Sequence, residues 1–290
     1  MKLRRPVLCI IALIAMQVCA EAQAIRAAYK FYYKSDVTDS GYFVEPDMML
    51  DYDGRTAAFY SDAAYHRDSL SMLAFDNNGN IKDNDAYGQI FDYRAGASSD
   101  LVLIDFENKS FEINYQEVTA YILGKSDNLE MPQWELHDTT ATYTRGGGYK
   151  VKMATANFMG RKWTVWYTDE VPVPAGPWLL WGAPGLIVLA SDSEDIFTFK
   201  LLNIDLLDAP TRYDNLKRHY HDKMPKMRYY SYDLKNAEKI HNRTQRDTKF
   251  SDELSGMNIS SAYIVHQNGE KEMYNNKRPY IPLIAEDYWK

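Results

Sequence analysis

The chain has 290 residues, 46% of them hydrophobic, and a formal net charge of −7 from 40 acidic and 33 basic residues. This length can bury a sizeable core, and the acidic balance repels phosphate backbones, so we expect no nucleic-acid partner. The only compact basic run, at residues 2–5, lies in a segment that we predict to be removed.

The first 24 residues have the pattern of an export signal. Basic residues precede a short apolar stretch at 7–18, and two overlapping small-x-small triplets end at Ala22 and Ala24. We predict a signal peptide over 1–24, cleaved after one of these two alanines, and a single domain over 25–290. The protein is therefore expected in the periplasm, at the outer membrane or outside the cell.

Both cysteines, Cys9 and Cys19, lie within this segment. The exported chain would then have no thiol for a disulfide, a metal ligand or a nucleophile. The apolar stretch is too short to span a bilayer comfortably, so no transmembrane segment is expected after signal removal. Two alternatives are an uncleaved anchor and lipid attachment at Cys19, although residues 16–18 before it lack the small residue that such attachment needs.

Tyrosine is abundant, with 23 residues, and together with other aromatic and β-branched residues it favours strands. A tyrosine-rich run at 25–34 opens the predicted domain. Close-spaced runs with turn residues between them indicate antiparallel hairpins, not βαβ units. Four such pairs occur: 48–50 with 56–60 around Asp53-Gly54, 101–106 with 111–115, 149–153 with 163–168, and 185–190 with 196–204.

Three segments have helical spacing of apolar residues, 62–75, 208–226 and 231–246, and a late strand is predicted at 263–265. The polar stretch 244–256 is expected to be mobile. The predicted fold is mainly β with minor α: a single curved antiparallel sheet or half-barrel with two or three helices.

Residues 176–187, called the signature bend below, form the most informative segment. The bend contains two Gly/Pro breaks around two tryptophans and runs into the apolar strand 185–190. Glycine accepts positive φ and proline fixes φ, so the bend is built to hold one shape. It carries no acid, base, thiol or hydroxyl, which indicates a structural or adhesive role. Its sequence is Gly-Pro-Trp-Leu-Leu-Trp-Gly-Ala-Pro-Gly-Leu-Ile.

The end of this bend resembles the signature of the GLPGLI family, with Ala183 where the family usually has leucine. The segment 154–168 is similar to the family's pattern of Ala, Phe, Gly-Arg and alternating aromatics, 176–178 to its Gly-Pro-aromatic step, and 279–283 to a Pro-aromatic-Ile-Pro-Leu ending. The resemblance implies an envelope or secreted protein of Bacteroidota-type bacteria with no established activity. Many members have a cysteine before the Ala-Thr step at 154–155, which this chain lacks.

Rings around a rigid bend suit core packing, whereas exposed rings would form a platform for a sugar, peptide or lipid chain. The platform hypothesis requires Trp178 and Trp181 to face solvent. The candidate binding residues are Arg161, Trp163, Trp166, Gly176, Pro177, Trp178, Trp181, Gly182, Pro184 and Gly185.

Other polar clusters give weaker patterns. The histidines are scattered, and on a helix His219 and His221 would point apart, so no zinc site is predicted; His241 with either of them is the one pairing of interest. The run 76–80 with later aspartates fits a turn better than a calcium loop. No nucleophile elbow, zinc-protease or phosphate-loop motif occurs.

We therefore predict a non-enzymatic binding or assembly factor with an unknown envelope ligand or protein partner, and no catalytic residue, metal or cofactor. One alternative is an envelope hydrolase or peptidase whose acidic and histidine residues meet only in space. The other is a metal-handling protein.

Overall fold

The computed structural model describes residues 24–38, 40–93, 100–117, 120–221, 227–254, 256, 263–265, 269–273, 277 and 279–289. The predicted signal peptide, except Ala24, lies outside these residues. Within them, no helix is both long enough and apolar enough to cross a membrane.

The chain is mainly β, with 43% strand and 23% helix, and its centre is one open sheet. Twelve strands pair in the order β12-β6-β5-β4-β3-β2-β1-β11-β10-β9-β8-β7. The bounds are β1 Ile25–Tyr33, β2 Phe43–Tyr52, β3 Thr56–Ser61, β4 Leu101–Asp105, β5 Ser110–Gln116, β6 Ala120–Ser126, β7 Glu135–Tyr143, β8 Tyr149–Phe158, β9 Arg161–Thr168, β10 Leu186–Asp192, β11 Phe197–Leu206 and β12 Arg228–Asp233. A separate hairpin joins β13, Tyr263–Val265, to β14, Lys271–Met273.

The four predicted hairpins are confirmed, because their turn residues act locally. At the β2–β3 turn, Gly54 has a φ of 91° and the Asp53 carboxylate accepts the backbone N–H groups of Arg55 and Thr56 at 2.9 and 2.7 Å. The run 76–80 is a turn as well, since the Asp76 carboxylate accepts the N–H groups of Asn78 and Asn80.

Two parts of the predicted fold are wrong. The sheet is mixed, because β12 pairs with β6 in parallel at its free edge. The described residues contain five α-helices instead of two or three: α2 Asp62–Ala74, α3 Asn84–Gln89, α4 Tyr213–His221, α5 Leu234–Arg246 and α6 Thr248–Leu254.

The missed elements are short and have local causes. Asp83 caps α3 by accepting the N–H groups of Asp85 and Ala86 at 3.0 Å, in a segment with no long apolar period. Residues 228–233, read in part as helix, extend along β6 instead. The stretch expected to be mobile contains the end of α5 and all of α6, and the predicted helix end at 222–226 lies outside the described residues.

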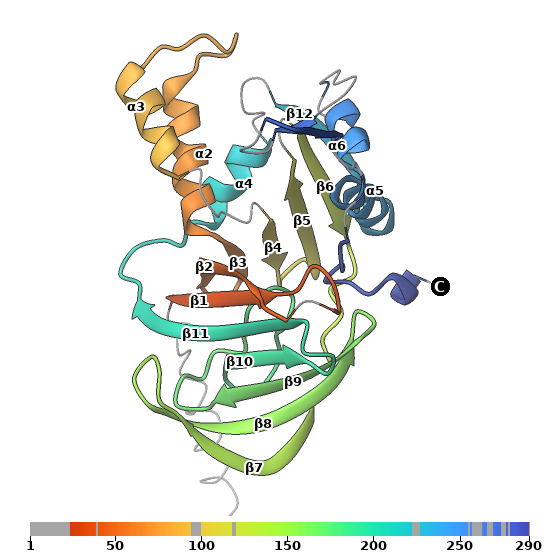
Figure 1. The fold of residues 1–290 in the computed structure, drawn as a ribbon. Helices are drawn as coiled ribbons and strands as arrows, with labels where there is room; N and C mark the ends of the chain where they lie inside the picture. The colour runs from red at the N-terminus through yellow and green to blue at the C-terminus, as the bar shows by residue number, and fades with distance from the viewer. Residues whose placement is uncertain are drawn as a thin grey trace, which may run out of the picture.

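Figure 1 shows how the sheet changes direction along its length. The strands β7 to β11 and β1 run across the lower body, whereas β4, β5 and β6 stand upright above them. Helix α5 packs on β6. Gly124 allows this close approach, because an added Cβ there would lie only 2.8 Å from the Cβ of Ala237. The polar face of α5 is thereby held beside the sheet.

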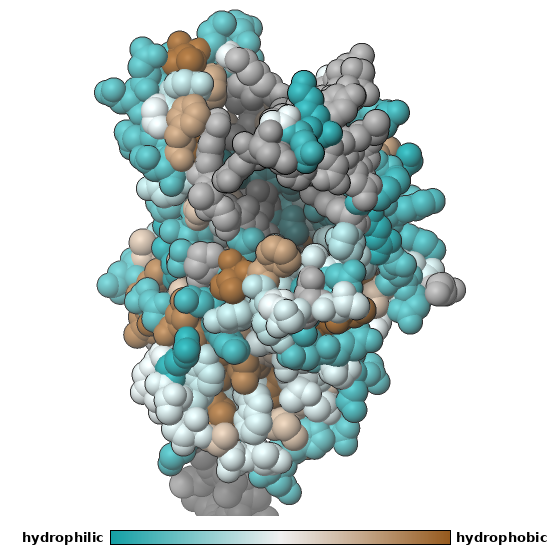
Figure 2. Space-filling view, in the orientation of Figure 1, coloured by the Kyte–Doolittle hydropathy of each residue, from teal (hydrophilic) through white to brown (hydrophobic). Residues whose placement is uncertain are grey.

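The main hydrophobic core lies against the long sheet and contains the fully buried side chains of Tyr29, Trp163 and Phe199. A second core cluster, which includes Tyr60 and Leu216, packs near α2 and α4. On the face shown in Figure 2, apolar residues gather across the middle of the molecule, with more hydrophilic surface above.

Candidate functional site

The signature bend is a buried structural element. Trp178 has 5% of its surface exposed, and Leu179 and Leu180 have 1% or less. Gly176 and Gly185 allow backbone contact, because added Cβ atoms would lie 2.4 Å from the carbonyl of Leu180 and 2.0 Å from that of Thr168. Pro177 is also buried, whereas Pro184 is exposed at the surface of the bend. The bend therefore sets the shape of this end of the core.

The rings that the sequence assigns to a platform pack mostly into this core. Trp163 has no exposed surface and lies 5.9 Å, centroid to centroid, from Trp178. Trp166 and Trp181 are half-buried. Trp181 donates from Nε1 to the Glu130 carbonyl at 3.2 Å. Gly182, with a φ of 84°, contacts Met131. Because Trp178 is buried, it does not join Trp181 in a solvent-facing platform.

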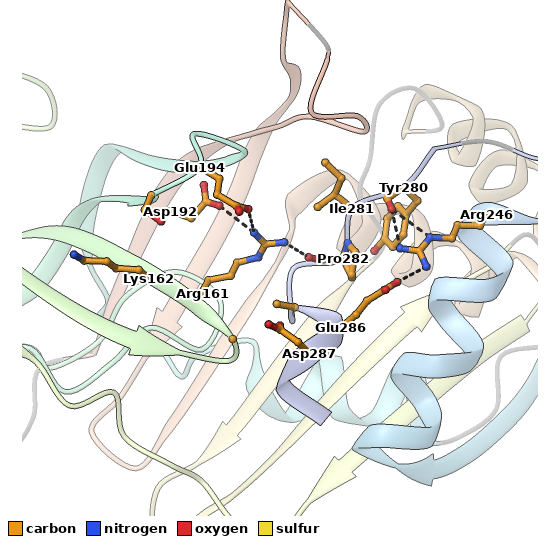
Figure 3. Close-up of a pocket in the computed structure, with 13 residues that line it drawn as sticks. Arg161, Lys162, Asp192, Glu194, Arg246, Tyr280, Ile281, Pro282, Glu286 and Asp287 are labelled. Atoms are coloured by element: carbon orange, nitrogen blue, oxygen red, sulfur yellow. Dashed lines mark hydrogen bonds and ion pairs between the residues drawn. The ribbon is translucent and has the colours of Figure 1, made fainter. Parts of the chain in front are cut away.

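Arg161 is the one charged candidate, and its guanidinium holds the C-terminal segment against the sheet. It donates to the Leu283 carbonyl from Nε at 3.0 Å and to the Pro282 carbonyl from Nη2 at 2.7 Å. Nη1 lies 3.1 and 3.2 Å from Asp192 and Glu194 (Figure 3). With these partners occupied, Arg161 positions a wall instead of presenting charge to a ligand.

That wall closes one side of a cleft of about 500 Å³, which we call the central cleft. Residues 279–283 form the wall, and Arg246 fixes it by donating to the Tyr280 carbonyl at 3.0 and 3.3 Å (Figure 3). Four stacked rings from β1, β2 and β11 face it, and we call them the aromatic ladder: Phe31, Tyr33, Phe43 and Phe197.

The ladder rings are regularly spaced, with centroids 5.4 Å apart for Phe43 and Tyr33, 5.3 Å for Tyr33 and Phe31, and 6.1 Å for Phe31 and Phe197. The guanidinium of Arg161 lies 4.7 Å from the Phe197 ring centroid, so the same arginine positions both sides of the cleft. Side chains of alternating residues share one face of a strand, which explains why Phe31 and Tyr33 line the cleft together.

A smaller cavity of about 50 Å³, called the inner chamber, adjoins the central cleft. The two share Phe31, Asp100, Tyr280 and Leu283 in their linings. The rest of the inner chamber combines apolar side chains with a hydroxyl and a carboxyl group: Met48, Phe59, Val102, Ile113, Tyr115, Trp178, Phe199 and Glu238. Trp178 thus reaches a candidate site from within the core.

A polar wall from α5 and β5 lies beside this junction. The His241 ring stacks on Tyr115 at 4.0 Å between centroids. Its Nδ1 lies 3.3 Å from Glu117 Oε1, and its Nε2 lies 3.0 Å from the Tyr280 hydroxyl. The Tyr115 hydroxyl donates to Glu238. Both ring nitrogens of His241 therefore have protein partners.

The polar wall contains one ion pair and two carboxyl groups that hold protons more readily than usual. Burial alone would raise the pKa of Glu117, but the hydrogen bond and charge of His241 outweigh it and lower that pKa. Burial would lower the pKa of His241, yet Glu117 and Asp100 raise it. Burial raises the pKa of Asp100 and of Glu238, with His241 opposing both shifts.

Sequence reasoning missed this wall because its parts are distant in the chain. Asp100 and Glu117 come from the β4–β6 region, and the other two come from α5. The one local signal was the spacing of Glu238 and His241, which places them on the same helix face. The suggested pairing with His219 does not form with His241: His219 stacks on Tyr65, at 5.7 Å between centroids. The side chain of His221 lies outside the described residues.

The described part of the chain contains no group of three or more His, Cys, Asp or Glu side chains arranged to hold a metal ion. Of the other described histidines, His66 pairs with Asp62 at 3.5 Å on the surface, and His137 lies 2.9 Å from the Thr155 hydroxyl. The described geometry therefore gives the metal-handling alternative no support.

No protein-family model and no curated protein matches the chain. Among solved structures, it is similar to PNGF-II in a C2 crystal form, with 11% identity, a TM-score of 0.48, and coverage of 78% of this chain and 34% of that one. A P21 form gives 12%, 0.44, 73% and 32%. An uncharacterised conserved protein from Thermus thermophilus gives 6%, 0.35, 77% and 99%. The chain spans about a third of PNGF-II, and likeness at this level does not identify a function.

Proposed function

We propose that the protein is an exported, non-enzymatic binding protein of GLPGLI type whose ligand occupies the central cleft. One observation carries the proposal: a cleft of about 500 Å³ is lined by four stacked rings and continues into an inner chamber. Clefts of this size with aromatic linings and a few polar groups are typical ligand sites. The export pattern and the resemblance of the signature bend support the location.

The shape of the sheet is consistent with this role. A sheet that curls as a half-barrel over an apolar groove is the form used by envelope carriers of lipids and lipoproteins. That parallel is an analogy at the level of fold, and the argument for binding comes from the cleft. The signature bend contributes by fixing the core end of the cleft through Trp178.

The aromatic ladder should dominate binding of an apolar ligand. We expect Phe31→Ala to weaken binding of the neutral fluorescent probe N-phenyl-1-naphthylamine about tenfold, or roughly 1.4 kcal/mol. Fluorescence titration of the purified protein measures this. The matched control is Tyr32→Ala, because Tyr32 lies on the opposite face of β1 and packs against Lys200, 4.7 Å from its ring centroid.

Phe43→Ala serves as a second ladder variant, since Phe43 is 53% exposed and its removal should leave the fold intact. Equal probe affinity in the wild type and both ladder variants would refute the cleft as the binding site. Absence of probe binding to the wild type would refute it as well.

The polar wall favours one second candidate function, an envelope hydrolase. His241 and Glu117 meet within 3.3 Å in a cleft, which is the arrangement that general acid–base catalysis requires. This candidate predicts turnover of chromogenic ester or amide substrates that His241→Gln abolishes and that His137→Gln, on the outer strand β7, leaves unchanged. Equal turnover in these two variants would assign the activity to a contaminant and remove the candidate.

A further inference from the structure

We propose that the ligand of the central cleft carries a protonated amine, which enters the inner chamber, on an apolar body that lies along the aromatic ladder. This inference rests on the proposed binding function and adds the chemical class of the ligand. It follows from the size of the inner chamber, its lining and the charges around both cavities.

The size of the inner chamber limits what it can hold. Its volume is about 50 Å³, against about 500 Å³ for the central cleft. A water molecule occupies roughly 30 Å³ of liquid, so the inner chamber accepts a group of ammonium size and excludes a ring. The body of a larger ligand must therefore remain in the central cleft, where the ladder rings provide stacking surfaces.

The lining of the inner chamber suits a cation with hydrogen-bond donors. Phe59, Trp178 and Phe199 contribute aromatic rings, which attract ammonium groups through their negative faces. Asp100 and Glu238 contribute carboxyl groups on the same lining. Rings combined with carboxyl groups provide both cation–π contact and acceptors for the N–H groups of an amine.

Charge around both cavities is one-sided. Among the described residues, the linings include the acidic side chains of Glu45, Asp100 and Glu238 but no lysine or arginine. His241 is the one basic side chain in these linings, and Glu117 pairs with it. An anionic head would meet these carboxyl groups without a cation to balance it.

The nearest arginines are engaged elsewhere. Arg246 donates to the Tyr280 carbonyl and pairs with Glu286, and Arg161 pairs with Asp192 and Glu194 (Figure 3). Neither of them lines the central cleft or the inner chamber. The local field at the junction is therefore set by the carboxyl groups, which favour a positive ligand group over a neutral or negative one.

The test compares three ligands of similar shape by isothermal titration calorimetry at pH 7. These are 2-phenylethylammonium, 2-phenylethanol and phenylacetate. We expect the amine to bind at least about tenfold more tightly than the alcohol, and phenylacetate to show no binding. The double variant Asp100→Asn/Glu238→Gln should bind the amine and the alcohol equally. Glu107→Gln, which changes a 57% exposed carboxylate paired with Arg55, should keep the preference.

The outcomes separate this inference from the proposed function. Equal affinity of wild type for the amine and the alcohol, or tighter binding of phenylacetate, would overturn the amine inference. If none of the three binds while N-phenyl-1-naphthylamine does, the amine inference is also wrong but the binding function stands. Failure of that neutral probe as well would overturn the function itself.

Discussion

Replacing Arg161 with methionine should lower the free energy of unfolding by about 3–5 kcal/mol, because it removes one partner of a buried ion pair. Arg161 and Asp192 are 9% and 5% exposed. The substitution also leaves the Pro282 and Leu283 carbonyls without their donor. Urea denaturation of the purified variant measures the loss as a lower midpoint with an unchanged slope.

A surface ion pair provides the control for this prediction. Arg55 and Glu107 form a pair at 2.8 Å with side chains 72% and 57% exposed. Such pairs contribute about 0–1 kcal/mol, so Arg55→Met should change stability little. If Arg161→Met costs no more than Arg55→Met, the guanidinium does not hold the C-terminal segment as described.

The same substitution should also affect binding. Arg161 fixes residues 282–283 and packs on Phe197, which form opposite sides of the central cleft. We expect weaker binding of N-phenyl-1-naphthylamine to Arg161→Met under conditions where the variant remains folded. Arg161 would then be a positioning residue for the cleft, which explains its place in the signature without a direct role in ligand contact.

Glu117→Gln should produce the second large effect, a loss of about 3–5 kcal/mol that is greatest in mildly acidic solution. Glu117 and His241 are 7% and 4% exposed and lie 3.3 Å apart. The substitution removes the negative partner of a buried imidazolium. Tyr115, Tyr280, Asp100 and Glu238 also face this histidine, but they do not replace the ion pair.

The pH dependence follows from the directions of the two shifts. The pKa of Glu117 is lowered in the folded state, so its contribution is present above its usual value of 4.5 and is lost as the pH falls. The pKa of His241 is raised, so its contribution is present below its usual value of 6.5 and is lost as the pH rises through the folded value. The pair therefore stabilises most between these limits.

Urea denaturation of the wild type and Glu117→Gln at pH 3, 5.5 and 9 measures this difference. The gap between the two proteins should be widest at pH 5.5. Glu107→Gln is the control and should follow the wild type at each pH, because Glu107 is exposed. A gap of constant size across the range would show that Glu117 contributes packing and hydrogen bonds but no ion pair.

Local patterns predicted much of the sheet. The Asp53-Gly54 turn and the glycine at 160, with a φ of 76°, specify hairpins from a few neighbouring residues. The parallel pairing of β12 with β6 depends instead on where α4 and α5 bring the chain back to the sheet edge. A short tyrosine-rich strand next to a helix gives no local signal for that pairing.

The candidate site was predicted only in part, for the same reason. Trp178 and Arg161 were identified, and the structure shows one lining the inner chamber and the other holding the wall of the central cleft. Asp100 and His241 were out of reach, because 141 positions of chain separate two residues that line one cleft. Which strands and helices meet determines such contacts, and sequence spacing does not reveal it.

The central claim is that the cleft beside the aromatic ladder holds a ligand in the cell. Native mass spectrometry of the full-length protein, purified from its own envelope fraction without detergent exchange, tests it most directly. We predict a bound species of fixed mass on the wild type that is reduced in Phe31→Ala and retained in Tyr32→Ala. A wild-type spectrum with the bare protein mass alone would contradict the account.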